Sequence, residues 1–413
     1  MSPRPRSRPL SSSASLAALA LLGLLARGAA GQVVTPAPDP DHPILSAATQ
    51  AWADGLIGAP LTGGNAFTLL ENGVQSFPEK LALVRAAQQD VFFTTMVAAW
   101  DDTGREMVRA LGDAVARGVR VRCLLDGQRA ERRFVRELRD RGVRVALFNP
   151  WLDVGGRRHR FHQKLLVADL RTMITGGMNM ADAYNRGDGR NDGYKDTDVR
   201  VAGDGAASAS LVFLAQWLEL EPGDAEARAL LASATTWGPL PLAGGPPARA
   251  GCARWLVQES DRGSTVLRDY YARCFGAARR QVLWHVNNLI PTDELTDALR
   301  AAVRRGVRVA IVTNSARANR RRVGWLLGLF QSAFQRLQRL RLRGTGIEMW
   351  ELDVPLHSKA LTVDGVMASI GSYNYSSSSE RNLEAACVVY DPALVHEVEA
   401  MFARDLAAAR RVQ

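Results

Sequence analysis

The sequence predicts an α/β fold made of two similar halves, each built around a mixed β-sheet. Two repeats support this prediction. A helix–strand segment at residues 110–121 recurs at 298–309, an offset of 188, and a His-x-Lys-x₄-Asp pattern recurs at an offset of 195. Strand and helix patterns alternate in each half, an order typical of α/β architectures. With 413 residues, the chain can hold two such halves and a sizeable core.

Each half is expected to start with a strand, a helix and a second strand. Apolar residues at helical spacing, followed by a glycine, predict the helix. These residues are Met107, Leu111, Ala114, Val115 and Gly118 in the first half, and Leu295, Leu299, Ala302, Val303 and Gly306 in the second. Strands are expected at 91–96, 119–125 and 143–148, and again at 282–286 and 307–313.

The His-x-Lys-x₄-Asp pattern follows in each half, on strands expected at 161–168 and 356–363. A further strand, at 173–176 or 366–370, should lead to a glycine-containing pair and an asparagine. Residues i and i+2 of a strand share a face, so the histidine and lysine of each copy should project together. The first copy comprises His162, Lys164, Asp169, Gly177 and Asn179, and the second His357, Lys359, Asp364, Ser372 and Asn374.

Together the two copies suit phosphoryl chemistry. Lysine and asparagine side chains can stabilise the charge on a phosphodiester without a metal, and no cofactor is expected. One histidine can attack phosphorus to form a phosphohistidine, while the other serves as general acid and then as general base. The two need different protonation states, so carboxylates are expected nearby. Glu384 is one candidate, and Asp196 and Asp198 compete for the other position.

This paired motif resembles the signature of the phospholipase D superfamily, over roughly residues 60 to 405. The resemblance implies two halves packed face to face around one active site, with an acid of each half supporting a histidine, often that of the other half. It implies catalytic roles for His162, His357, Lys164, Lys359, Asp196 and Glu384, and substrate contacts for Asn179, Asn374, Ser372 and Gly177. It makes Asp169 and Asp364 mostly structural.

Shorter stretches at 100–104, 196–200, 288–294 and 388–392 resemble the cardiolipin synthase branch. Asp198, however, stands where many such synthases have histidine. The branch implies a phospholipid substrate and either hydrolysis or phosphatidyl transfer to an alcohol. The alternative is a nuclease, because the basic run at 157–160 could contact backbone phosphates. A non-catalytic phosphate-binding module is the third hypothesis.

The N-terminus predicts export to the periplasm or medium. Arg4, Arg6 and Arg8 precede a 13-residue apolar stretch at 14–26, and small residues follow at 28–31. An uncleaved anchor is the competing interpretation, although the stretch is short for a membrane span. The expected organisation is a signal at 1–31, a flexible lead-in at 32–59, and halves at 60–240 and 250–410, with the boundary in the Pro/Gly-rich stretch 238–250.

The formal net charge of +10 suits a phosphate-rich partner but does not distinguish lipid from nucleic acid. Residues 314–344 contain eight arginines around an apolar segment at 323–330, which suits a helix lying on an anionic membrane. A helix packed on its own domain is the alternative. Because one chain supplies both half-sites, a monomer is expected to be active.

The four cysteines do not form a metal motif. Cys123 and Cys387 lie in apolar strand patterns and are expected to be core thiols, whereas Cys252 and Cys274 could form a disulfide in an exported protein. The remaining histidines do not cluster with cysteine or carboxylates at metal-ligand spacing, so no metal site is expected.

Overall fold

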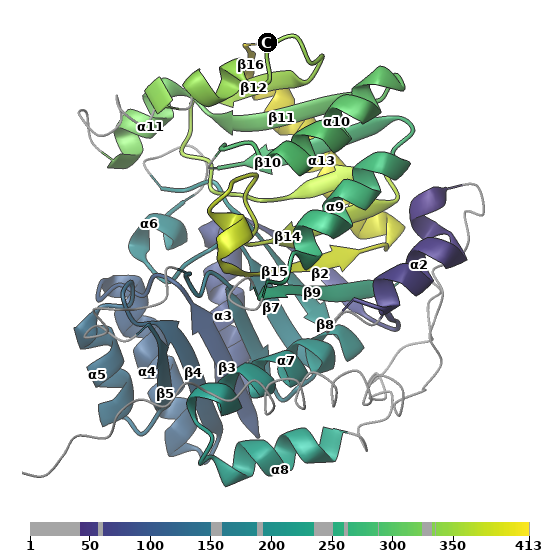
Figure 1. The fold of residues 1–413 in the computed structure, drawn as a ribbon. Coiled ribbons are helices and arrows are strands. Elements are labelled where there is room, and N and C mark those ends of the chain that lie inside the picture. The colour runs from purple at the N-terminus through teal and green to yellow at the C-terminus, as the bar shows by residue number, and fades with distance from the viewer. Residues whose placement is uncertain are drawn as a thin grey trace, which may run out of the picture.

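The computed structural model describes residues 42–56, 61–149, 159–187, 193–234, 251–259, 263–287, 289–323, 333–334 and 336–412. In these ranges the chain forms two mixed α/β halves that pack against each other, the first below the second in Figure 1, which confirms the predicted fold class. The expected signal at 1–31 and the boundary at 238–250 lie outside the described residues. Over the ranges described, no helix is both long enough and apolar enough to span a bilayer.

The first half contains a seven-stranded sheet in the order β2-β8-β7-β6-β3-β4-β5. Strands β3, β4 and β5 run parallel, whereas β6, β7, β8 and β2 pair antiparallel. The strands are β2 (Ala66–Glu71), β3 (Asp90–Thr95), β4 (Arg120–Asp126), β5 (Arg144–Phe148), β6 (Leu165–Ala168), β7 (Thr172–Gly176) and β8 (Thr197–Ala202). The helices are α3 (Gly73–Ala86), α4 (Asp102–Ala116), α5 (Arg132–Asp140), α6 (Asp182–Asn185), α7 (Asp204–Leu220) and α8 (Ala225–Ser233).

The second half repeats this plan in a nine-stranded sheet, ordered β1-β9-β15-β14-β13-β10-β11-β12-β16. Its strands are β1 (Leu61–Thr62), β9 (Ala253–Glu259), β10 (Gln281–Val286), β11 (Arg308–Asn314), β12 (Glu348–Leu352), β13 (Leu361–Val363), β14 (Met367–Gly371), β15 (Leu383–Val389) and β16 (Arg410–Arg411). Its helices are α9 (Val266–Ala277), α10 (Asp293–Arg304), α11 (Ala316–Val323), the short η4 (Ser379–Arg381) and α13 (Pro392–Ala408).

The predicted helix–strand repeat is confirmed by α4–β4 and α10–β11. Met107 and Leu111 of α4, and Leu299 of α10, are fully buried, as their apolar spacing requires. The glycines that follow the two helices have nearly identical left-handed backbones, with φ of +90° at Gly118 and +89° at Gly306. A side chain at such a φ would be strained, which explains why glycine ends both helices.

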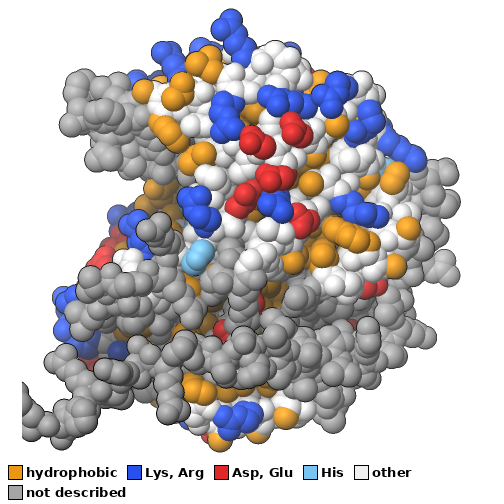
Figure 2. All heavy atoms as spheres, viewed as in Figure 1, with side chains coloured by type: hydrophobic (Ala, Val, Ile, Leu, Met, Phe, Trp, Pro, Cys, Tyr) orange, Lys and Arg blue, Asp and Glu red, His pale blue; other side chains and the backbone are white. Residues whose placement is uncertain are grey.

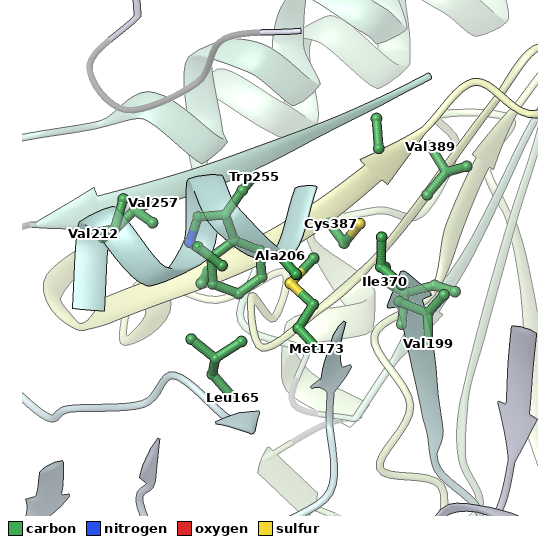
Figure 3. Packing of buried hydrophobic residues seen from close by; sticks show 14 of the residues in the cluster. Leu165, Met173, Val199, Ala206, Val212, Trp255, Val257, Ile370, Cys387 and Val389 are labelled. Atoms are coloured by element: carbon green, nitrogen blue, oxygen red, sulfur yellow. The ribbon is translucent and has the colours of Figure 1, made fainter. Parts of the chain in front are cut away.

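A single apolar cluster joins the two halves. Figure 3 shows Met173 and Val199 of the first sheet lying close to Ile370 and Cys387 of the second, with helix α7 alongside. Strands β7 and β8 lie against β14 and β15. Separating the halves would expose this cluster to water, so the halves are expected to fold as one unit.

The strands expected to carry the two His-x-Lys segments are shorter than predicted. Strand β6 begins at Leu165 and β13 at Leu361, so both histidines and both lysines precede their strands. The reason is that these segments pair with the opposite half rather than with a neighbouring strand of their own sheet. Single parallel bridges join Phe161 to Leu383 and Lys195 to Leu356.

The flexible lead-in predicted at 32–59 is wrong for residues 42–56, which fold onto the second half as η1 (Pro43–Leu45) and α2 (Ala47–Asp54). Ile44 is fully buried. The fully buried Arg254 of β9 donates hydrogen bonds to Gln50 Oε1 at 2.7 Å and Asp54 Oδ1 at 2.6 Å. The segment supplies partners to a buried cation, and it is therefore structural.

All four cysteines are free and buried. Cys252 and Cys274 are therefore not joined by a disulfide in this structure. Like Cys123 and Cys387, they pack as small core side chains.

Candidate active site

Two buried histidine–carboxylate pairs cross between the halves. His162 Nδ1 lies 2.8 Å from Glu384 Oε2, and His357 Nδ1 lies 2.7 Å from Asp196 Oδ2. The acids thus exchange between the halves, as the resemblance implied. Asp198 instead forms an ion pair of 2.8 Å with Lys80 of α3, so Asp196 is the acid that contacts His357.

The two bridges between the halves hold these pairs together. The His162 amide donates to Leu383 O at 2.9 Å, and the His357 amide donates to Lys195 O at 2.7 Å. Leu383 and Lys195 each directly precede the acid that contacts the same histidine. One backbone hydrogen bond therefore fixes each histidine main chain next to its carboxylate.

A second pair of equivalent residues supports the same segments. Asp126 Oδ2 accepts from the Phe161 amide at 3.0 Å, and Asn314 Oδ1 accepts from the Leu356 amide at 2.5 Å. Asp126 and Asn314 end strands β4 and β11, 188 residues apart. They were not predicted from the sequence, although their matching places in the repeat are a signal that could have identified them.

The motif aspartates lie away from the histidines and organise the starts of strands β3 and β10. Asp169 and Asp364 both adopt positive φ values, +51° and +55°. Each carboxylate accepts three successive backbone amides, from Gln88, Gln89 and Asp90 or from Arg279, Arg280 and Gln281. This geometry gives both residues a structural role.

Both motif lysines are buried close to the histidines. Lys164 is 4% exposed and Lys359 is 2% exposed. Each ammonium donates to the main-chain oxygen of its own histidine, and Lys359 Nζ also lies 2.8 Å from His357 Nδ1. Burial lowers the pKa of Lys164 to about 8, although the carboxylates of Glu384 and Asp196 oppose that shift.

The two pairs differ electrostatically. Burial lowers the pKa of His162 below its ordinary value, and Lys164 adds to this effect against the opposing charge of Glu384. Burial alone would raise the pKa of Glu384, but its contact with His162 lowers the net value. Burial raises the pKa of Asp196 despite the nearby Lys359. His162 is thus expected to be neutral beside an ionised Glu384.

Among the residues that the structure describes, aromatic side chains lie against one of the two motif histidines, His357. Tyr184 and Tyr194 lie against the His357 ring, with ring centroids 5.0 and 5.3 Å away. The Tyr184 hydroxyl lies 3.4 Å from His357 Nε2. Tyr184 lies five residues after the motif asparagine, where the second half has Ser379. This contact was missed by sequence reasoning because neither tyrosine belongs to the repeat.

The predicted substrate ligand Asn179 has protein partners for its side chain. It is 1% exposed, its Oδ1 accepts from the Val97 amide at 3.1 Å, and its Nδ2 donates to the Tyr184 hydroxyl at 2.8 Å. Asn374 differs, because its Oδ1 is buried and has no hydrogen-bond partner. The structure therefore gives Asn179 a supporting contact, whereas Asn374 Oδ1 is buried without a partner among the described residues.

The other two predicted substrate ligands contact the acids instead. The Ser372 hydroxyl donates to Glu384 Oε2 and accepts from the Ala385 amide at 3.0 Å. A Cβ on Gly177 would lie 2.1 Å from Asp196 Oδ1. The close approach expected at this glycine is thus to the Asp196 carboxylate. Both residues shape the environment of an acid, and their predicted contacts with substrate stay predictions.

Across the ranges that the structure covers, no group of three or more His, Cys, Asp or Glu side chains could hold a metal ion. The chemically active groups of the site are the two imidazoles, the two ammonium groups and the two carboxylates. Such a set can provide a nucleophile, a proton donor and charge stabilisation for an anionic phosphodiester.

Comparison with known proteins agrees with this geometry. Residues 81–191 and 271–406 match the family model "Cardiolipin synthase, PLD-like domain". Cardiolipin synthase B of Escherichia coli (strain K12) is 28% identical over 341 residues, 79% of this chain and 77% of that protein. Cardiolipin synthase 1 of Bacillus anthracis is 24% identical over 365 residues, 84% of this chain and 68% of that protein.

A solved structure shows the same fold. The phosphatidylserine synthase of Haemophilus influenzae superposes with a TM-score of 0.65 at 16% identity, covering 86% of this chain and 89% of that one. The matched family model spans both histidine–lysine motifs and more than half of the sequence. The chain therefore belongs to the phospholipase D superfamily of enzymes, in its cardiolipin synthase-like branch.

Proposed function

We propose that this enzyme transfers the phosphatidyl group of a phospholipid through a covalent phosphohistidine on His162, with phosphatidylglycerol as donor and a second phosphatidylglycerol or water as acceptor. The observation that carries the proposal is the exchanged pair of histidine–carboxylate contacts beside two buried lysines. The substrate class is inferred from the relatives, which are cardiolipin synthases.

In the first step, neutral His162 donates its Nδ1 proton in a hydrogen bond to Glu384, which leaves Nε2 free to attack phosphorus. The bond between phosphorus and the leaving oxygen breaks as protonated His357 gives its Nε2 proton to that oxygen. In the second step, His357 takes a proton from the incoming alcohol or water, whose oxygen attacks phosphorus. The bond between phosphorus and His162 then breaks.

Two observations support His162 as the nucleophile. The pKa of His162 is lowered by burial, so its imidazole is unprotonated and able to attack. The Tyr184 hydroxyl lies near Nε2 of His357, where it can contact the oxygen that receives or gives up the proton. Lys164 and Lys359 are placed to stabilise the charge on the phosphoryl oxygens. Because one chain supplies both pairs, we propose that the monomer is active.

A turnover assay in a chelator-containing buffer tests the proposed function. Phosphatidylglycerol vesicles and single-stranded DNA are offered in parallel to the wild-type protein and to His162→Ala. Conversion of lipid that the variant lacks would support the proposal, and the ratio of cardiolipin to phosphatidic acid would separate transfer from hydrolysis. Cleavage of DNA with inert lipid would refute the substrate class and favour the nuclease alternative.

The pH dependence of kcat/KM is expected to be bell-shaped. Activity should fall as pH rises through about 8, because Lys164 loses its proton there and no longer stabilises the phosphate. On the acid side, activity should fall as His162 becomes protonated, at a pH below the ordinary histidine range. Steady-state kinetics on the wild-type protein and Lys164→Arg will check this. Arginine stays charged, so the alkaline limb should move to higher pH, and an unmoved limb would show that another group controls it.

We also propose that the protein is exported and contacts the membrane peripherally. The signal and residues 324–330 of the apolar segment lie outside the described residues. The described residues that follow nevertheless suit an anionic membrane surface. Phe334, Leu337 and Leu340 are 45%, 60% and 57% exposed at helical spacing. The adjoining groove is lined by six arginines, namely Arg320, Arg336, Arg339, Arg343, Arg410 and Arg411. Figure 2, viewed as in Figure 1, shows basic side chains gathered over the upper part of the molecule.

Leu337→Ser is expected to weaken binding to phosphatidylglycerol vesicles by about tenfold or more, because burying one leucine side chain contributes about 1.5–3 kcal/mol. Vesicle sedimentation measures this. Val74→Ser is the matched control, since Val74 is a similarly exposed apolar residue, at 55%, on helix α3. Equal binding of the two variants would contradict a membrane contact at 333–340.

A further inference from the structure

A buried polar network lies behind His357. The Ser358 hydroxyl, between His357 and Lys359 in the sequence, is fully buried. It lies 2.8 Å from the Thr197 hydroxyl and 3.2 Å from His285 Nδ1. His285 belongs to β10 and is itself fully buried. Buried polar side chains such as these need hydrogen-bond partners, because water does not reach them.

The network continues to the C-terminal helix α13. His285 Nε2 lies 3.1 Å from Asp405 Oδ2, and Lys195 Nζ lies 3.0 Å from Asp405 Oδ1. Burial would raise the pKa of Asp405, but His285 and Lys195 together lower it. Asp405 is thus an ionised carboxylate at ion-pair distance from His285 Nε2, although within the described residues this contact lacks the geometry of a hydrogen bond. On its other side, the His285 ring contacts the Ser358 hydroxyl through Nδ1, and Ser358 in turn contacts Thr197.

Both ends of this polar network lead back to the segment that carries Asp196. Thr197 follows Asp196 and Lys195 precedes it. Lys195 O also accepts from the amides of His357, at 2.7 Å, and Ser358, at 3.3 Å. The contacts therefore form a closed ring that fixes the main chain of His357 relative to the Asp196 carboxylate.

The His162 side of the site is built differently. The residues equivalent to Ser358 and His285 are Gln163 and Thr94, from the matching positions after the motif histidines and along strands β3 and β10. Gln163 Nε2 and Thr94 Oγ1 are both buried without a hydrogen-bond partner. The ring is thus a feature of the His357 half within the described residues, and its presence there is not explained by the shared fold.

We infer that His285 and Asp405 are positioning residues for His357, holding its imidazole in the orientation that proton transfer to and from the substrate oxygen requires. The inference rests on the proposed function, in which His357 is the general acid and base. It predicts a defect confined to steps in which His357 moves a proton, because neither residue contacts His162 or its acid.

His285→Phe tests this inference. It keeps an aromatic ring against Phe402, whose ring centroid lies 4.1 Å from that of His285, and it leaves Asp405 paired with Lys195 and Ser358 with Thr197. Two substrates are compared by kcat/KM. Phosphatidylglycerol has an alcohol leaving group that needs a proton, whereas phosphatidyl-p-nitrophenol has a leaving group acidic enough to depart without one. We expect a loss of about tenfold to a hundredfold on the first substrate and no more than about twofold on the second.

Thr94→Val is the matched control at the equivalent position of the first half, and both substrates should be turned over as by the wild-type protein. Asp405→Asn disrupts the ring at a second position. If His285→Phe unfolds at a markedly lower temperature than the wild-type protein, the same two-substrate comparison on Asp405→Asn tests the inference. Unchanged kinetics, or equal losses on the two substrates in a folded variant, would overturn the inference. A wild-type protein inactive on both lipids would instead refute the proposed function.

Discussion

His162→Ala is expected to abolish phosphodiester turnover, whereas His357→Asn is expected to stop after the first step and to retain a phosphatidyl group on His162. Without the His162 imidazole no covalent intermediate can form, and the loss should be about 10⁴-fold or more. In His357→Asn, a substrate with an acidic leaving group can still react with His162, but no base remains to activate the acceptor. The phosphohistidine should therefore accumulate.

Mass spectrometry of the peptide that contains His162 will detect this adduct. His396→Asn is a suitable control because His396 is exposed on helix α13. It should show full turnover and no accumulated adduct. A stable adduct on His357 in a His162→Asn variant would reverse the assignment of the two histidines.

Asp224→Ala is expected to destabilise the fold by about 3–5 kcal/mol, because it removes the nearest of three carboxylates that contact a buried cation. The Arg122 side chain is 1% exposed, and its Nε lies 2.9 Å from Asp224 Oδ2. Asp224 also caps α8 through the Ala227 amide at 2.9 Å and accepts from Trp217 Nε1 at 3.0 Å. Chemical denaturation measures the free energy of unfolding, and the specific activity of the folded variant should be unchanged.

The matched control is Glu226→Ala. Glu226 also contacts Arg122, at 3.4 Å, but its side chain is 57% exposed, so its loss should cost less than about 1 kcal/mol. Hydrogen bonds from Arg122 and the Ala227 amide hold the pKa of Asp224 well below its ordinary value, against the opposite effect of burial. Its stabilising contribution should thus be complete above the ordinary aspartate pKa of about 4 and shrink as pH falls below it. Equal destabilisation by the two variants would contradict this account.

The sequence was sufficient to predict the two halves because each short motif occurs twice in the same order. It could not separate Asp196 from Asp198, since residues two apart on an extended chain point to the same side. Only the position of α3, which brings Lys80 to Asp198, distinguishes them. The β-bridges that join Phe161 and Leu356 to the opposite half could not be predicted from the sequence either. Pairing between distant segments depends on the tertiary fold and leaves no local pattern.

Other features were missed for similar physical reasons. Tyr184 reaches His357 because α6 follows the motif of the opposite half, which spacing along one chain does not reveal. Residues 42–56 follow a proline-rich stretch, which predicts a flexible lead-in, yet they supply partners to Arg254. The predicted phosphate ligand Asn179 has the right residue type, but its partners are set by the neighbouring loop.

The exchange of acids between the halves also determines when during synthesis the enzyme can become active. A ribosome completes the segment with His162 long before it reaches Glu384, which is the 384th of 413 residues. Until then, the first histidine has no carboxylate to orient it, and Asp196 has no histidine to contact before residue 357 is made. A nascent or truncated polypeptide that lacks its last 30 residues thus has a complete first motif but no Glu384. In the proposed mechanism, the His162–Glu384 pair can therefore form only after residue 384 has been made.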